Sequence, residues 1–349
     1  MTLAARRIDV HHHVIPPVVA KAMSRHGVTK VGGAALPRWT ARASIRTMDL
    51  YGVQTAVTSL SAPGVYFGDL AEACDLARAS NEFSAQMVLD HPGRFGWFAV
   101  LPMPFTAQAC AEAVHALDVL KADGVVLLGS TEGVFLGDPR LDELMAELDR
   151  RAAVVFVHPN LHRTSTELDL ATPGYLVEFL CDTTRAATNL ILTGTLERYP
   201  RIRWILAHAG GFLPYIAWRL SLANDQFKLA RTLPKGMLNY IRSFYFDTAL
   251  SPSPSVMAAL RELVDPSHIL FGSDYPFAPA RAVGMEVKAL ENLRVFDAKT
   301  LAGIDRDHAL ALFPRLAALP QAPPDRLGVK LQRALVKPID DLAERLRDR

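Results

Sequence analysis

The stretch Arg7-Ile8-Asp9-Val10-His11-His12-His13 lies close to the N-terminus, and the fold can be worked out from it. Ile8 and Val10 alternate with polar residues as in a short buried β-strand, and the histidines stand where that strand should end. Side chains two apart on a strand share a face, so His11 and His13 can converge while His12 points away. Two imidazoles can bind a metal, but a catalytic zinc needs about three protein ligands. Other parts of the chain must supply the rest.

The composition is that of a globular protein with a large core. The chain has 349 residues, half of them hydrophobic, with a formal net charge of +2, which gives no electrostatic footprint for nucleic acid. We find no apolar run of about 18 residues and no signal-peptide pattern, and we therefore expect no membrane span. Cys74, Cys110 and Cys181 are far apart and form no C-x-x-C pair, which favours a reducing, cytoplasmic location.

Strands and helices alternate along the chain after residues 7–13. Apolar or β-rich runs predict seven further strands, at 54–60, 95–101, 124–128, 152–157, 202–207, 244–246 and 268–271. Helices are predicted between nearly every pair, at 18–25, 45–50, 70–89, 107–120, 139–151, 175–194, a segment that carries Arg219, and 256–263. Eight such units favour an α/β fold of the (β/α)8 barrel type, with its active site at the carboxyl ends of the strands. An open doubly wound sheet is the alternative, but no Gly-rich phosphate loop follows the first strand.

Two segments do not fit the alternation. Residues 14–40 are rich in Pro and Gly and predict a small lid insertion after the first strand, with one short helix. Three prolines, Pro320, Pro323 and Pro324, separate the barrel from a charged, amphipathic C-terminal stretch. We therefore expect a barrel over residues 1–315 and a helical C-terminal extension over 316–349.

Polar side chains end several of the predicted strands. His11 and His13 end the first, His158 the fifth, His208 the sixth and Asp274 the eighth. Taken singly, His158 fits a hydrogen-bonded core histidine and Asp274 a turn residue. Their joint placement at the mouth of one barrel predicts a metal site, with nitrogen and oxygen ligands that suit Zn²⁺ or Mn²⁺.

The same motifs resemble those of a known family. Residues 8–13 (IDVHHH), 156–159 (FVHP), 206–211 (LAHAGG) and 271–277 (FGSDYPF) are similar to the marks of the amidohydrolase-2 family, which includes aminocarboxymuconate-semialdehyde decarboxylase and the hydroxybenzoate decarboxylases. The resemblance covers roughly residues 7–315. Within the family, residues 179–190 look most like 6-methylsalicylate decarboxylases.

The resemblance implies a ligand set and a cofactor. His11, His13, His158 and Asp274 would bind one divalent metal ion, and His208 would be the acid/base beside it. Hydrolytic relatives with two metals use a lysine at the end of the fourth strand, where this chain has none. Zn²⁺ is the expected ion, with Mn²⁺ and Mg²⁺ as alternatives and no organic cofactor. Related enzymes are dimers or larger, so we expect a homodimer or a higher homo-oligomer.

The implied reaction is the non-oxidative decarboxylation of a hydroxylated aromatic acid such as 6-methylsalicylate, by a carbon–carbon lyase. The metal would chelate the carboxylate and an ortho hydroxyl, and Asp274 or His208 would protonate the ring carbon. Four residues are candidates for substrate binding. Trp39 and Tyr66 could form an apolar slot for the ring or belong to the core, and Arg185 could pair with the acid or cap a helix. Arg219 matches an arginine that, in the muconate decarboxylase of the family, reaches a neighbouring subunit's substrate.

Other functions remain open at this level. The same metal site could serve a hydrolase or hydratase of a lactone or dicarboxylate, or a decarboxylase of an open-chain muconate semialdehyde. A non-catalytic barrel that keeps the metal for stability is a third class.

Overall fold

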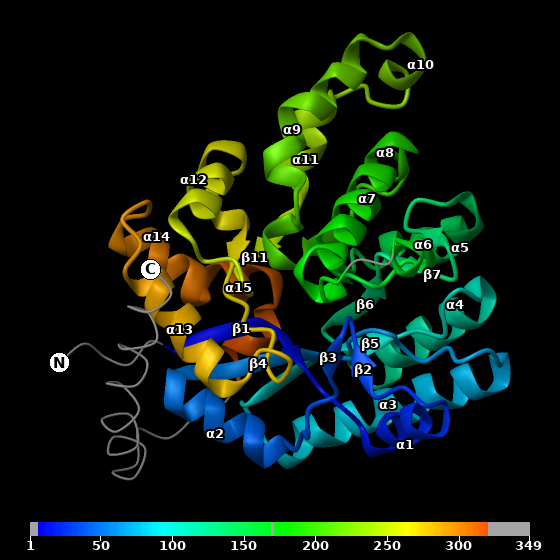
Figure 1. The fold of residues 1–349 in the computed structure, drawn as a ribbon, viewed down its shortest axis with the longest axis vertical. Helices are drawn as coiled ribbons and strands as arrows, with labels where there is room; N and C mark the ends of the chain where they lie inside the picture. Colours follow the sequence, from blue (N-terminus) through cyan, green and yellow to red (C-terminus); the bar gives the residue numbers. More distant parts are fainter. Residues whose placement is uncertain (1–5, 169–170, 320–349) are drawn as a thin grey trace.

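A barrel of eight parallel strands forms the centre of the computed structural model, which describes residues 6–168 and 171–319 (Figure 1). The strands follow one another around the sheet in sequence order, as expected when each strand is joined to the next by a right-handed crossover. They are β1 (Arg7–His13), β4 (Val53–Ser59), β5 (Phe95–Val100), β6 (Gly124–Leu128), β9 (Val154–His158), β10 (Arg203–Leu206), β11 (Tyr245–Asp247) and β12 (Ile269–Leu270). The predicted strands are confirmed to within two residues at each end.

The barrel closes where β1 meets β12 and the residues after it. Val10 donates a backbone hydrogen bond to Phe271 (2.9 Å), and His13 donates one to Tyr275 (2.6 Å). The N–H of Asp274 returns to the carbonyl of His11 at 2.8 Å. This closure, which we call the seam, confirms the (β/α)8 barrel and excludes the open sheet.

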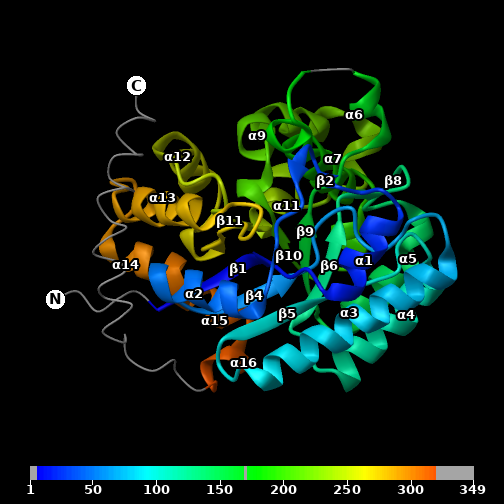
Figure 2. The same cartoon turned by 60° about the horizontal axis from the view of Figure 1, so that its bottom comes forward.

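Helices surround the strands, as Figures 1 and 2 show. One of them illustrates how local sequence sets the boundaries: the Thr40 hydroxyl accepts from Ala43 N–H at the start of α2, and Gly52 ends it with φ 72°. The principal helices are α2 (Ala41–Tyr51), α3 (Leu70–Asp90), α4 (Thr106–Val114), α5 (Asp142–Arg150), α7 (Glu178–Leu192), α9 (Leu213–Ser221), α11 (Met237–Ser243), α12 (Pro254–Leu263) and α13 (Ala280–Glu291). None of the helices within the described residues is long and apolar enough to cross a membrane.

The first strand contains an irregularity that orients the histidines. Asp9 pairs with Ala56 and His12 with Thr58, so β1 has one residue more than β4 over this interval, which is a β-bulge. His12 lies on the outer side, with Nε2 3.1 Å from the hydroxyl of Ser44 on α2. His11 and His13 face inward, with their Nε2 atoms 3.1 Å apart. The prediction that His12 points away from the other two is confirmed.

The two segments outside the alternation have different outcomes. After β1, the chain forms α1 (Pro17–Arg25) and a hairpin of β2 (Lys30–Val31) with β3 (Ala34–Ala35), where we expected a lid with one helix. The extension was expected over 316–349, but of it only 316–319 fall within the described residues, and the helices predicted there stay a prediction. The predicted helix 175–194 is wrong at its start, because the backbone leaves the helical region at Val177 (φ −128°) and α7 begins at Glu178.

Candidate metal centre

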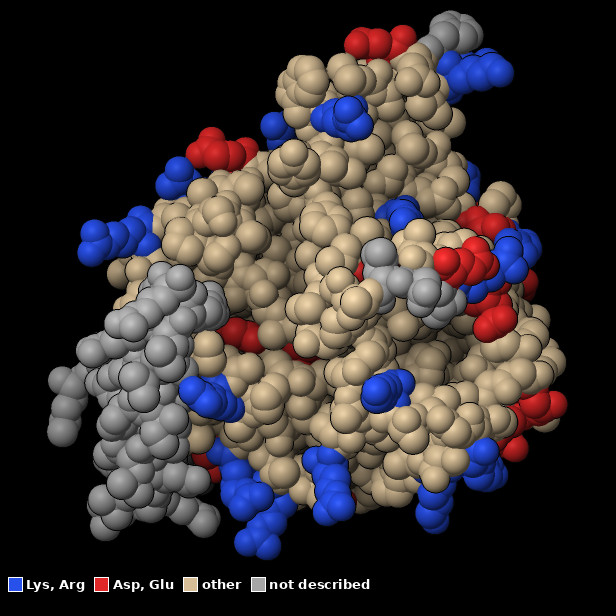
Figure 3. All heavy atoms as spheres, in the orientation of Figure 1, with Lys and Arg blue, Asp and Glu red and all other residues tan. Residues whose placement is uncertain are grey.

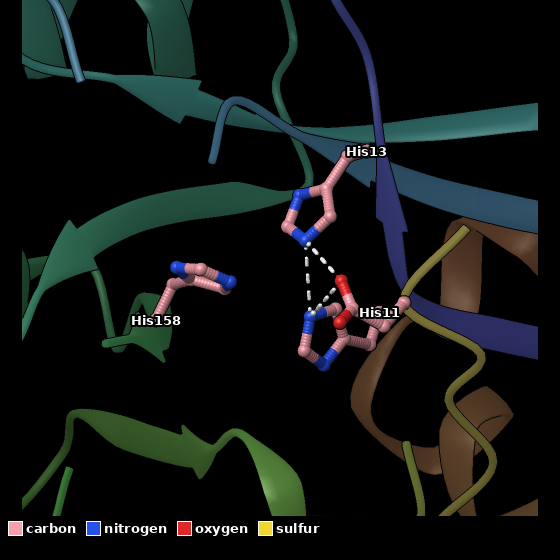
Figure 4. Close-up of side chains that lie close together, drawn as sticks. His11, His13 and His158 are labelled. Carbon is pink, nitrogen blue, oxygen red and sulfur yellow. Dashed lines mark hydrogen bonds and ion pairs between the residues drawn. The ribbon is translucent and has the colours of Figure 1, made fainter. Parts of the chain in front are cut away.

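Four side chains meet at the carboxyl end of the barrel. His11, His13, His158 and Asp274 are all buried, and each offers one ligand atom, with these atoms within 4.8 Å of one another. His11 and His13 come from the end of β1, His158 from the end of β9, and Asp274 from the turn after β12. Figure 4 shows the three imidazoles pointing toward a common centre. The structure therefore brings together every residue expected to bind the metal.

The second ring nitrogen of each histidine is already engaged. Each Nδ1 faces an oxygen acceptor, so a ring in its neutral, metal-binding form carries its proton there and turns the Nε2 lone pair toward the centre, as in most metal-binding histidines. The acceptors are the Asp247 carboxylate for His11 (2.7 Å), the Ser59 carbonyl for His13 (3.2 Å) and the Pro159 carbonyl for His158 (2.8 Å). Three imidazole nitrogens and one carboxylate, held this way, fit a single divalent cation.

The pKa shifts of the four residues also fit a cation-binding site. Burial lowers the pKa of His13, and it holds the pKa of His158 well below the ordinary value, so both rings are neutral. Burial also opposes a charge on His11, but the carboxylates of Asp247 and Asp274 outweigh it and raise its pKa to about 10. For Asp274, burial is outweighed by His11 and by hydrogen bonds from the histidines, and its pKa lies well below 3.8. In the metal-free protein His11 is therefore protonated at neutral pH, and its positive charge lies among the carboxylates that would otherwise face a metal cation.

His208 stands beside these four residues. It begins the turn His208–Gly210 after β10, its Nε2 lies 3.5 Å from Asp274 Oδ2, and its ring centroid lies 4.9 Å from that of His11. The side chain is buried, yet neither ring nitrogen has a hydrogen-bond partner among the described residues. The next residue in the chain after the turn is Gly211, and only glycine fits there because a Cβ would lie 2.4 Å from the Leu180 carbonyl oxygen. The turn thus presents to the centre an imidazole that no short hydrogen bond holds, which a substrate or a transferred proton can engage.

A cavity of about 240 Å³ opens above the cluster. Its lining includes His158, His208 and Asp274, together with Ser61, and among the described residues no Lys or Arg lines it. Figure 3, in the orientation of Figure 1, shows a hollowed centre surrounded mainly by uncharged atoms. The remaining walls are apolar or aromatic and consist of Val31, Ala34, Tyr175, Phe179, Leu250, Phe277, Ala278, Pro279 and Ala282.

Comparison with known proteins shows which family this chain belongs to. The family model for amidohydrolases matches residues 8–315. The chain belongs to the amidohydrolase family. The family expected from the strand-end motifs is thereby confirmed.

Several relatives of this amidohydrolase are decarboxylases. It is 37% identical over 324 residues to 6-methylsalicylic acid decarboxylase from Penicillium expansum, which covers 90% of this chain and 98% of the relative. It is also 37% identical over 323 residues to decarboxylase yanB from Aspergillus niger, covering 88% of each chain. Among solved structures, an amidohydrolase II superposes with a TM-score of 0.82 at 30% identity, covering 88% of this chain and 99% of that one.

A more distant solved structure shares the fold. The dihydroxybenzoic acid decarboxylase from Polaromonas sp. JS666, determined with manganese and the inhibitor 2-nitroresorcinol, superposes with a TM-score of 0.76 at 24% identity and covers 88% of this chain and 96% of that one.

The four substrate residues expected from the sequence do not line the cavity of this amidohydrolase. The Trp39 indole donates to Ser44 and packs against Phe83. Tyr66 lines a separate small cavity of about 20 Å³. Arg185 and Arg219 are exposed on α7 and α9.

Sequence reasoning missed several residues of the site. Asp247 ends β11 as Asp274 follows β12, so the strand-end signal that marks Asp274 marks Asp247 as well. Phe277 ends the 271–277 motif, and Phe179 begins the stretch 179–190, but neither spacing nor composition distinguishes such aromatics from core residues. Leu250, with φ 53°, carries no sequence signal that we can identify.

Proposed function

We propose that this protein is a metal-dependent, cofactor-free decarboxylase of an ortho-hydroxylated aromatic acid of the 6-methylsalicylate type. The observation that carries the proposal is the position of the His11–His13–His158–Asp274 cluster at the base of an apolar cavity. Four N and O ligands suit a carboxylate-chelating divalent ion, and the apolar walls suit a ring. The relatives that decarboxylate 6-methylsalicylic acid support the same reaction.

The walls next to the ligands favour a flat substrate. Phe179 packs edge-on against His158, with ring centroids 5.9 Å apart, and Phe277 packs edge-on against His13 at 5.4 Å. A ring held between these two aromatic side chains would have its carboxylate at the metal end. No Lys or Arg of the described ranges 6–168 and 171–319 lines the cavity, so a second carboxylate would find no cationic partner there, which argues against an open-chain dicarboxylate.

The reaction consumes one proton. The ring carbon that bears the carboxylate gains a proton, the bond to the carboxylate carbon then breaks, its electron pair returns to the ring, and CO2 leaves. The metal, when bound, would orient the carboxylate and the ortho hydroxyl and stabilise negative charge. We assign the proton to His208, because its Nδ1 has no partner among the described residues and its Nε2 has only the long 3.5 Å contact with Asp274. The pKa of the Asp274 carboxyl, by contrast, is held well below 3.8 by His11 and by the hydrogen bonds that it accepts, against the effect of burial.

The metal and the assembly are part of the proposal. We propose Zn²⁺ as the resident ion, with Mn²⁺ as the alternative because a decarboxylase of the same fold was solved with manganese. We also propose a homodimer. Tyr215 and Trp218 on α9 are 89% and 75% exposed, and Arg219 beside them is exposed as well, so a second subunit could cover this face. A cytoplasmic location is supported by the free thiols of Cys74, Cys110 and Cys181.

The test is product formation by the metal-loaded protein. We expect CO2 release from 6-methylsalicylate and other ortho-hydroxybenzoates, none from 4-hydroxybenzoate, and one deuteron at the vacated ring carbon in D2O. Chelator-treated protein is the control. Turnover of esters or lactones without CO2 from any ortho-hydroxybenzoate would refute the proposal. Elemental analysis and light scattering test the ion and the dimer.

A further inference from the structure

Asp247 is a completely buried carboxylate at the end of β11, and it touches two parts of the site at once. Its Oδ2 accepts the Nδ1–H of His11 at 2.7 Å. Its Oδ1 accepts the backbone N–H of His208 at 2.8 Å and that of Ala249 at 3.0 Å. Both oxygens of the carboxylate are therefore engaged, one by the metal ligand His11 and the other by two backbone amides.

The contact with His208 matters because of the backbone there. His208 and Ala209 both have φ 55°, a left-handed conformation that is costly for residues with a Cβ. Such a conformation persists only when the surrounding contacts hold it. A hydrogen bond from the first amide of this turn to a buried carboxylate is a contact of that kind.

We propose that Asp247 is a positioning residue that fixes the metal ligand His11 and the His208 turn relative to each other. Through His11, it sets the tautomer that points Nε2 at the metal. Through the His208 amide, it holds the imidazole of His208 beside the ligands His11 and Asp274. The second part rests on the proposed function, in which His208 delivers the proton; the first part does not.

The Asp247→Asn variant separates this role from general packing. An amide offers one oxygen and one NH2, but Asp247 faces donors on both sides. If the amide oxygen faces the His208 and Ala249 amides, its NH2 forces the Nδ1 of His11 to accept, which moves the ring proton to Nε2 and blocks metal binding. If it faces His11, the NH2 opposes the two backbone N–H groups and the turn loosens. Either orientation disturbs one half of the site.

The matched control is Asp123→Asn. Asp123 also accepts three hydrogen bonds, from Trp97 N–H and the Arg315 guanidinium, but it precedes β6, at the opposite end of the barrel. The Asp123→Asn variant therefore shows the effect of losing a buried, hydrogen-bonded carboxylate on the stability of the fold, without altering the metal site. Three readouts are compared in the parent and both variants: Mn²⁺ affinity by electron paramagnetic resonance, amide exchange of peptides spanning 203–213, and decarboxylation at saturating metal in the presence and absence of His208→Asn.

We expect Asp247→Asn to raise the Mn²⁺ Kd by about 10- to 100-fold or to accelerate exchange in 203–213, or both, whereas Asp123→Asn changes neither. The effect of Asp247→Asn on kcat at saturating metal should vanish when His208 is already replaced by Asn. In the parent, the His208 amide should exchange as slowly as the strands, a reading that needs no folded variant. Unchanged affinity and exchange in Asp247→Asn, or equal changes in Asp123→Asn, would overturn the proposal. If both readouts change but no ortho-hydroxybenzoate is decarboxylated, only the proposed reaction fails.

Discussion

The side chain of Asp9 accepts two hydrogen bonds from Ser273, one from its hydroxyl at 2.5 Å and one from its backbone N–H at 3.1 Å. Asp9 lies on the first strand and Ser273 follows the last, so the contact joins the two sides of the seam. Both residues are buried, and the ligands His11 and Asp274 lie within two residues of them. The polar contact that helps close the barrel is thus adjacent to the metal ligands.

Ser273→Ala should weaken the seam. The variant leaves part of the buried Asp9 carboxylate without a donor, which costs about 1–3 kcal/mol of unfolding free energy. Denaturant titration of the metal-free protein measures it. Ser255→Ala, at an exposed serine of α12, is the control and should stay within about 0.5 kcal/mol of the parent. Equal stability of the two variants would contradict this account of the seam.

Removal of a ligand should remove the metal. His158→Ala and Asp274→Ala each delete one of the four ligands, and we expect both proteins to lose most of their metal by elemental analysis after dialysis. His162→Ala is the matched control, since His162 caps α6 (Arg163–Glu167) and is not part of the cluster. Metal content equal to that of the parent in either ligand variant would disprove the assignment.

His208→Asn should separate chemistry from metal binding. The imidazole is not among the four clustered ligands, so metal content should stay at the parent level. Loss of the proton donor should lower kcat by about 100-fold or more, with a smaller change in KM. Steady-state kinetics on metal-saturated protein decide the matter, and a kcat within a few-fold of the parent would assign the proton to Asp274 instead.

Metal binding should release a proton at neutral and mildly alkaline pH. The pKa of His11 is raised to about 10 in the metal-free protein, so the ring is protonated at pH 7–9 and must lose that proton to bind the ion. We expect about one proton per ion and an apparent affinity that rises about tenfold per pH unit, levelling off as the pH passes the His11 pKa. Calorimetry in buffers of different protonation enthalpy measures the proton count. Absence of proton release at pH 8 would refute the prediction.

The barrel and the polar cluster at its mouth could be predicted from the sequence because both depend on local patterns, whereas the division of that cluster into four ligands and His208 came from the family resemblance. Each strand is a short apolar run, and the ligands follow such runs, so topology alone brings them to one end. The bulge between Asp9 and His12 could not be predicted, since it depends on the register against β4. Simple alternation from Ile8 and Val10 would put His12, and not His11, on the inner face.

Tertiary contacts explain the remaining differences. The helix α13 was not predicted, and it contains Gly284, an unfavourable helix residue; a Cβ there would lie 2.5 Å from the Tyr51 ring, so the glycine allows close packing on α2. The cavity walls could not be predicted because Phe179, Leu250 and Phe277 converge from separate loops and helices. Trp39 and Tyr66 are aromatic residues of the same kind and face other neighbours.

The seam has a further consequence for handling the protein. A closed barrel exposes no unpaired strand edge, but β12 spans only two residues, and the ligands on either side of the seam belong to β1 and to the turn that follows β12. An ion bound by ligands from both sides would hold β1 and the turn after β12 together. Its removal would let the two strands part and present free edges onto which other chains can add. We therefore expect chelated protein to aggregate on storage sooner than the metal-loaded form.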